Sequence, residues 1–64
     1  MKEKLKLLRN QMGVSQKDVA KAIGITPSAY SNYEQGTREP SIQILINLCK
    51  YFDVSADYLI GLED

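Results

Sequence analysis

The sequence has no histidine and only one cysteine, Cys49, among its 64 residues. A single cysteine excludes a disulfide within one chain, and a zinc site would need histidines or more than one cysteine. The chain also lacks a glycine-rich phosphate loop, a thiol beside a base and a cluster of carboxylates. We therefore expect no catalytic residues, no metal and no cofactor, and an enzyme is nearly excluded.

Long apolar runs are absent as well. The longest contains three residues, as at Ile44–Ile46, so no segment is long enough to span a membrane. The first six residues carry charge, and the apolar core of a secretion signal does not follow them. We expect a cytoplasmic protein that has no membrane partner.

The chain also has no net charge, because eight basic residues balance eight acidic ones. The balance is uneven along the chain, because residues 1–38 hold seven bases and three acids, a net charge of +4, and residues 39–64 carry −4. Such a protein can present one basic face to phosphate groups, although the same charges also suit solvated helix surfaces. The length predicts a single domain, 1–64, whose small core favours oligomerisation.

The residues that are present predict five helices and no strands, so the expected fold class is all-α. Hydroxyl residues suited to helix N-termini stand at Ser15, Thr26, Ser41 and Ser55. The expected helices run from about residue 2 to 12, from a cap at 15 to the glycine at 24, from a cap at 26 to 35, from a cap at 41 to 52, and from a cap at 55 to the glycine at 61. The first helix carries Leu5, Leu8 and Met12 at helical spacing, and the fourth is expected to have a strong apolar face of Ile42, Leu45, Leu48, Cys49 and Phe52.

Two short helices joined around a glycine have the geometry of a helix-turn-helix, here at about residues 16–35. Ala20 is small where the following helix crosses, and Gly24 allows the sharp turn. Ile25 is expected to fill the gap between the helices, and Tyr30 and Tyr33 to seat the second helix on the core. Together at this spacing, the five residues make a fairly specific signal.

The pattern resembles the phage-repressor/Cro-like helix-turn-helix family, also called the XRE family, over nearly the whole chain. The matching residues are Leu5-x-x-Leu8-Arg9, Val14-Ser15-Gln16, Val19-Ala20, Ile23-Gly24-Ile25, Tyr33-Glu34-x-Gly36, Pro40-Ser41-Ile42 and Asp53-Val54-Ser55-x-Asp57-x-Leu59. The resemblance implies a compact five-helix bundle of the lambda-repressor type, which binds double-stranded DNA and regulates transcription. It further implies a repressor of phage or bacterial type that binds a near-palindromic operator as a homodimer.

The resemblance places the helix from Pro27 to Gln35 in the DNA major groove. Asn32 is the first choice for a base contact, because a carboxamide can pair with adenine N6 and N7. The helix carries no arginine or glutamine on its central face, so phosphate contacts and DNA shape are expected to contribute strongly. The expected base-contacting residues are Ser28, Ala29, Ser31 and Asn32, and the expected phosphate-contacting residues are Gln16, Lys17, Thr26, Gln35, Thr37 and Arg38.

The resemblance also pairs Arg9 with Glu34 across the core, which makes Glu34 a structural residue. Apolar residues without an assigned place in the core become candidates for the dimer interface, namely Tyr51, Tyr58, Ile60 and Leu62. One further class of function stays open. An antitoxin or another module that binds a protein partner shares this fold.

Overall fold

The secondary structure follows the order that the sequence predicts. The computed structural model describes residues 1–62, and within them it contains five helices and no strand. They are α1 (Lys2–Met12), α2 (Gln16–Ile23), α3 (Pro27–Gln35), α4 (Ile42–Phe52) and α5 (Ala56–Ile60). No helix in this part of the chain combines the length and the apolar character needed to cross a membrane. The all-α fold class is therefore confirmed.

Local hydrogen bonds explain why the helices begin where they do. Ser15 Oγ accepts from the backbone N–H of Asp18 at 3.1 Å, and the Asp18 carboxylate accepts from the Ser15 N–H at 3.0 Å. This reciprocal capping box satisfies two N–H groups that have no partner within the helix. The hydroxyls of Thr26, Ser41 and Ser55 accept in the same way at the starts of α3, α4 and α5. All four caps predicted from the sequence are confirmed.

The end of α4 differs from those of the other helices, because it has no glycine. Asp53 takes the left-handed conformation there, with φ 56° and ψ 51°. Aspartate tolerates this conformation better than most residues, since its short polar side chain can bond locally. The chain can therefore turn after Phe52 and bring α5 back over the core.

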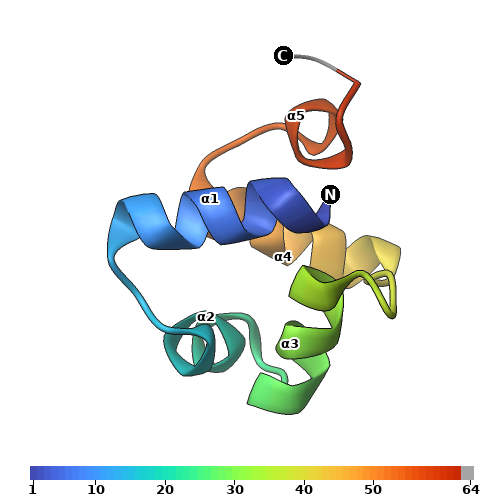
Figure 1. Cartoon of the computed structure of the whole chain (residues 1–64). Helices are drawn as coiled ribbons and strands as arrows, with labels where there is room; N and C mark the ends of the chain where they lie inside the picture. Colours follow the sequence, from blue (N-terminus) through green and yellow to red (C-terminus); the bar gives the residue numbers. More distant parts are fainter. Residues whose placement is uncertain (63–64) are drawn as a thin grey trace.

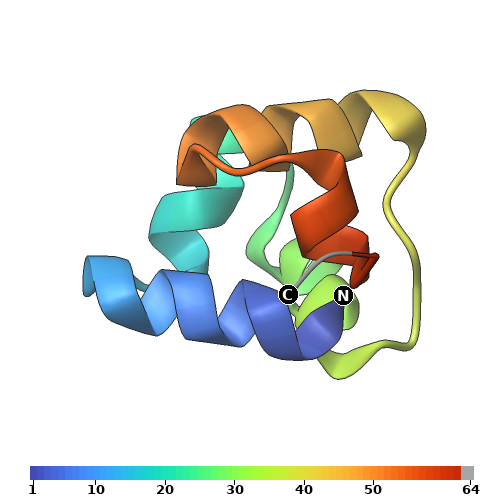
Figure 2. The same cartoon turned by 90° about the horizontal axis from the view of Figure 1, so that it is seen from above.

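The helices enclose one apolar core. Its fully buried side chains include Leu5, Val19, Leu48 and Leu59, which come from four different helices. Burying one such side chain contributes about 1.5–3 kcal/mol relative to leaving it exposed. In Figure 1, α2 and α3 lie together on one side of the molecule and α5 lies on the opposite side, beyond α1 and α4. Figure 2 shows α1 and α4 on opposite sides of α5.

One residue in each of the predicted apolar patterns of α1 and α4 is exposed. The exposed fraction is 78% for Ile42 and 48% for Met12, so the placement of Ile42 on the buried face is wrong and Met12 also lies outside the core. Ile42 is the first residue of α4 and Met12 is the last of α1. Apolar spacing defines a helix face, but only the tertiary arrangement decides whether a neighbouring helix covers the terminal turn of that face.

Candidate nucleic-acid interface

The connection between α2 and α3 fixes the angle at which the two helices meet. Gly24 ends α2 in the left-handed conformation, with φ 81°, and the N–H of Ile25 donates to the carbonyl of Ala20 at 3.0 Å. Thr26 then caps α3 at the N–H of Ala29, and Pro27 occupies its first turn. The result is two short helices packed on the same side of the molecule (Figure 1).

A cluster of polar side chains joins α1, α2 and α3. Arg9 donates through Nε to Glu34 Oε2 at 2.7 Å and through Nη2 to Oε1 at 3.2 Å. Its Nη1 donates to the carbonyl of Val14 at 3.2 Å, and Gln16 Nε2 donates to Glu34 Oε1 at 3.1 Å. The predicted pairing of Arg9 with Glu34 is confirmed. The two-pronged geometry makes it directional as well as ionic.

The electrostatics of the cluster keep both partners charged. The hydrogen bond to Glu34 is the largest cause that raises the pKa of Arg9 above its ordinary value. Burial alone would raise the pKa of Glu34, but its polar neighbours, first Arg9 and then Tyr30 and Gln16, outweigh it and leave that pKa below its ordinary value. Glu34 is 1% exposed, so its charge depends on these donors.

Tyr30 lies beside this cluster and is completely buried. Its hydroxyl makes no hydrogen bond with any residue in the described part of the chain. Burial is the largest cause that raises the pKa of the phenol, and the neighbouring Glu34 carboxylate adds to it. Tyr30 is thus a neutral core residue, in agreement with the core position given to it by the sequence.

The four expected base-contacting residues lie on one helix, but they differ in solvent exposure and in their hydrogen bonds within the chain. Ser28 is exposed, whereas Ala29, Ser31 and Asn32 are half-buried. Ser31 Oγ accepts from Gln35 Nε2 at 3.0 Å, and the hydroxyl of Thr37 lies 3.3 Å from Asn32 Oδ1. The face is therefore polar, and two of its side chains are already oriented by neighbours from the end of α3 and the following loop.

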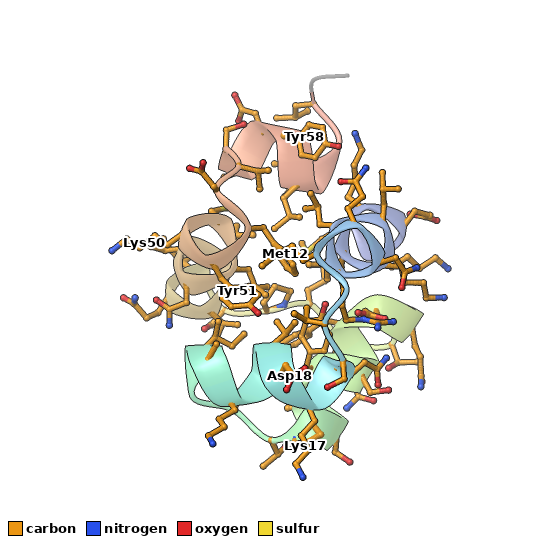
Figure 3. The ribbon with its side chains drawn as sticks, turned by 90° about the vertical axis from the view of Figure 1, so that its left-hand side faces the viewer. Met12, Lys17, Asp18, Lys50, Tyr51 and Tyr58 are labelled. Atoms are coloured by element: carbon orange, nitrogen blue, oxygen red, sulfur yellow. The ribbon has the colours of Figure 1, made fainter. Side chains whose placement is uncertain are left out.

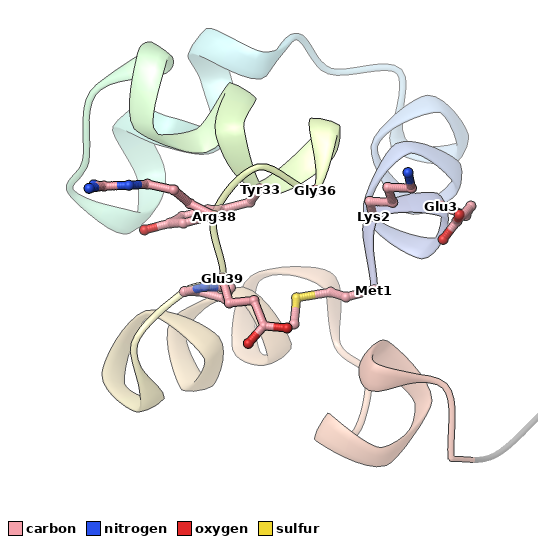
Figure 4. A pocket seen from close by; sticks show the side chains of 8 residues that line it. Met1, Lys2, Glu3, Tyr33, Gly36, Arg38 and Glu39 are labelled. Atoms are coloured by element: carbon pink, nitrogen blue, oxygen red, sulfur yellow. The ribbon is translucent and has the colours of Figure 1, made fainter.

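The expected phosphate-contacting residues separate into two groups. Lys17 and Arg38 are exposed and have no ion pair with any residue among 1–62. Lys17 extends from α2 away from the other helices (Figure 3). The side chains of Arg38 and Tyr33 lie next to each other and point in the same direction as each other (Figure 4). In the second group, Gln16, Thr26, Gln35 and Thr37 all use their side chains in hydrogen bonds within the chain.

A cation that the sequence interpretation missed lies close to the end of α3. A Cβ placed on Gly36 would come within 2.8 Å of Lys2 Cδ, so the stem of Lys2 crosses this glycine closely. Figure 4 shows Lys2 at the start of α1, beside Gly36. Only the fold brings these positions together, and the positive charge near the N-terminus was the one available signal.

A surface cleft of about 230 Å³ lies between the start of α1 and the loop after α3. Lys2 and Arg38 line it, and so do the acids Glu3 and Glu39, which makes its charge mixed. Within residues 1–62 no three side chains of the metal-ligating kinds lie close enough to share an ion. The polar surface of α2 and α3, flanked by Lys17 and Arg38, is therefore the candidate site.

The four residues expected at the dimer interface lie on α4, on α5 or just after α5, and two of the four are exposed to solvent. Ile60 is 43% exposed and Leu62 is 74% exposed. Tyr51 packs against the core and meets Phe52 edge to face, with ring centroids 5.1 Å apart. Tyr58 lies under Lys4 of α1, whose Nζ is 3.9 Å from the centroid of its ring. The rings of both tyrosines thus already make contacts within the chain.

Known proteins share this arrangement. A family model described as helix-turn-helix matches residues 5–59. The HTH-type transcriptional regulator YqaE of Bacillus subtilis is 47% identical over 58 residues, which cover 91% of this chain and 50% of that protein. YgzD, another HTH-type transcriptional regulator of Bacillus subtilis, is 31% identical over 64 residues, which cover 100% of this chain and 97% of that protein.

A solved structure extends the likeness to three dimensions. The P22 c2 repressor protein, crystallised in complex with a synthetic operator, superposes with a TM-score of 0.92 at 27% sequence identity. The match covers 97% of this chain and 94% of the repressor chain. The chain spans about half the length of YqaE and of several other relatives that it matches. By sequence and by fold, this chain belongs to the helix-turn-helix family.

Proposed function

We propose that this chain is the DNA-binding unit of a transcription regulator, most simply a repressor of phage or bacterial type. The observation that carries the proposal is the paired surface of α2 and α3, in which polar side chains of α3 are flanked by Lys17 and Arg38, two cations that form no ion pair within residues 1–62. The close structural likeness to a repressor bound to an operator supports the same function. In this proposal α3 enters the major groove of double-stranded DNA.

The proposed contacts fall into two classes. Lys17 and Arg38 bind phosphates as charges, while Gln16, Thr26, Gln35 and Thr37 have hydrogen-bonding groups at the edges of the same surface. Gln16 keeps a second amide N–H beyond the one that it donates to Glu34, so it can bind Glu34 and a phosphate together. Base edges are left to Ser28, Ala29, Ser31 and Asn32, with Asn32 as the main contact.

We further propose that the chain acts as a homodimer on a near-palindromic operator, in the cytoplasm. One copy of α3 covers only half of such a site. Ile60 and Leu62 supply exposed apolar surface at the side opposite α2 and α3. This position would let two copies associate without covering the proposed DNA surface.

Titration of duplex DNA at several salt concentrations tests the DNA-binding proposal. The affinity should fall steeply with salt, because each neutralised phosphate releases counterions. Arg38→Ala should reduce the slope of log affinity against log salt by about one unit. Lys50→Ala is the matched control: Lys50 is exposed and extends from α4 (Figure 3), so its loss should leave the slope unchanged. Failure to bind any duplex at low salt would contradict the proposal and favour a protein-binding module.

A further inference from the structure

The loop after α3 is bonded to the backbone carbonyl of Asn32. The N–H of Thr37 donates to the Asn32 carbonyl at 3.1 Å, and the N–H of Arg38 approaches the same oxygen at 3.4 Å. The N–H of Gly36, which caps α3, also donates to it. These bonds fix the backbone of Thr37 relative to Asn32, so the Thr37 hydroxyl has a defined position.

That hydroxyl lies equally close to two oxygens of Asn32. Thr37 Oγ1 is 3.3 Å from the backbone carbonyl oxygen and 3.3 Å from the side-chain Oδ1. A hydroxyl carries one hydrogen, and a carbonyl oxygen has two lone pairs. Because backbone N–H groups already use the lone pairs of the Asn32 carbonyl, the better acceptor for the hydroxyl hydrogen is Oδ1.

This contact restrains the Asn32 carboxamide. With Oδ1 held at Thr37, the Nδ2 amino group is on the other side of the carboxamide, and it donates to no residue in the described part of the chain. One lone pair of Oδ1 also stays available. The carboxamide thus presents a donor and an acceptor from a defined position, whereas an unrestrained carboxamide could rotate about its bond to Cβ.

We propose that Thr37 is a positioning residue that sets the base preference of Asn32, favouring adenine over guanine. Adenine presents an N7 acceptor and an N6 donor in the major groove, which match Nδ2 and Oδ1. Guanine presents O6 in place of the N6 amino group, so two acceptors would face each other. A restrained amide cannot turn its Oδ1 away from the guanine, whereas an amide that rotates freely could donate through Nδ2 alone, and the discrimination would become smaller.

The inference rests on the proposed DNA binding. A measurement of base preference distinguishes a Thr37 that positions Asn32 from a Thr37 that only contacts a phosphate. Operator sequences selected from a random duplex pool by the wild-type chain provide the probe. An adenine-to-guanine exchange is then made at the position whose preference Asn32→Ala removes. Thr37→Val keeps the shape of the side chain and removes the hydroxyl, and it should reduce the adenine preference about three- to tenfold, the equivalent of one hydrogen bond. Thr37→Ser should retain the preference.

Several outcomes would overturn the inference. Thr37→Val could weaken binding to all duplexes equally, as the loss of a phosphate contact would do, or Asn32→Ala could leave every base preference unchanged. In the Asn32→Ala background, Thr37→Val should have no further effect on base preference, and any such effect would contradict the mechanism. Equal melting temperatures of the variants would exclude a folding defect as the cause.

A second measurement needs no DNA and so separates the two proposals. Nitrogen-15 relaxation of the Asn32 side-chain amide should show an ordered group in the wild type and a more mobile one in Thr37→Val. If the amide is equally ordered in both, the inference fails even where DNA binding is intact. If the wild type binds no duplex, the function proposal fails, and an ordered amide would then report only a structural bond.

Discussion

The two parts of the chain share one apolar core, and the first part adds directional polar bonds between its helices. In residues 1–38, directional polar bonds join the helices, since Arg9, Gln16 and Glu34 connect α1, α2 and α3 through measured donor and acceptor pairs. In residues 39–62, the contacts that attach α4 and α5 to the core are mainly apolar, through Leu48 and Leu59. The first part carries the excess of basic residues and the second part the excess of acids.

The difference follows from what each part is proposed to do. A surface that reads DNA needs its helices fixed in angle and rotation, and hydrogen bonds depend on direction whereas the hydrophobic effect does not. Apolar packing holds α5 in place and still leaves Ile60 and Leu62 exposed. The contrast agrees with the proposed roles, which are DNA recognition for the first part and association between copies for the second.

Removing the cation from the polar cluster should have the largest effect. Arg9→Met keeps most of the apolar stem but leaves the buried Glu34 carboxylate without its ion pair, so the free energy of unfolding should fall by about 3 kcal/mol. Urea unfolding measures the loss. Arg38→Met is the matched control, because Arg38 is exposed and forms no ion pair within residues 1–62, and its effect should stay within about 0.5 kcal/mol.

A second change would confirm that the unpaired charge is the cause. The double variant Arg9→Met with Glu34→Gln should recover part of the stability, since it removes the buried charge as well. A loss below about 1 kcal/mol in Arg9→Met would contradict the view that this cluster fixes the first part of the molecule. DNA affinity would then be expected to survive the loss of Arg9.

Self-association should respond to charge placed in the second part. Ile60→Lys puts an ammonium group into the proposed interface and should weaken the dimer at least about tenfold, as seen by sedimentation equilibrium. Met12→Lys is the matched control, because Met12 is similarly exposed, at 48% against 43%, but lies at the far end of α1. A wild-type chain that stays monomeric at high concentration, with and without operator DNA, would refute the dimer.

The smallest effect is expected at Tyr30, between the polar cluster and the core. Tyr30→Phe removes a buried hydroxyl that makes no hydrogen bond with residues 1–62, so the free energy of unfolding should rise, or change by less than about 1 kcal/mol. Tyr33→Phe, at a half-buried position, serves as the control. A loss above about 1.5 kcal/mol would mean that the hydroxyl contributes a hydrogen bond to the cluster, which would extend the polar network into the core.

The local structure could be predicted from short segments because its causes are local. Ser15 and Asp18 form their capping box within one helical turn, and Gly24 ends α2 through its own backbone freedom. The likeness to helix-turn-helix proteins added one distant pair, Arg9 with Glu34. The base and phosphate contacts are proposals, because they depend on how the surface of α2 and α3 meets a duplex.

The sequence by itself thus determined the five helices, their caps and the turn between α2 and α3, because these depend on neighbours within about four residues. Only the tertiary structure decided that Ile42 is exposed and that Gln16 donates to Glu34, because both depend on helices far apart in the chain. It also decided the role proposed for Thr37. The hydroxyl is only five residues from Asn32, yet its hydrogen bond depends on how the loop folds back over the end of α3.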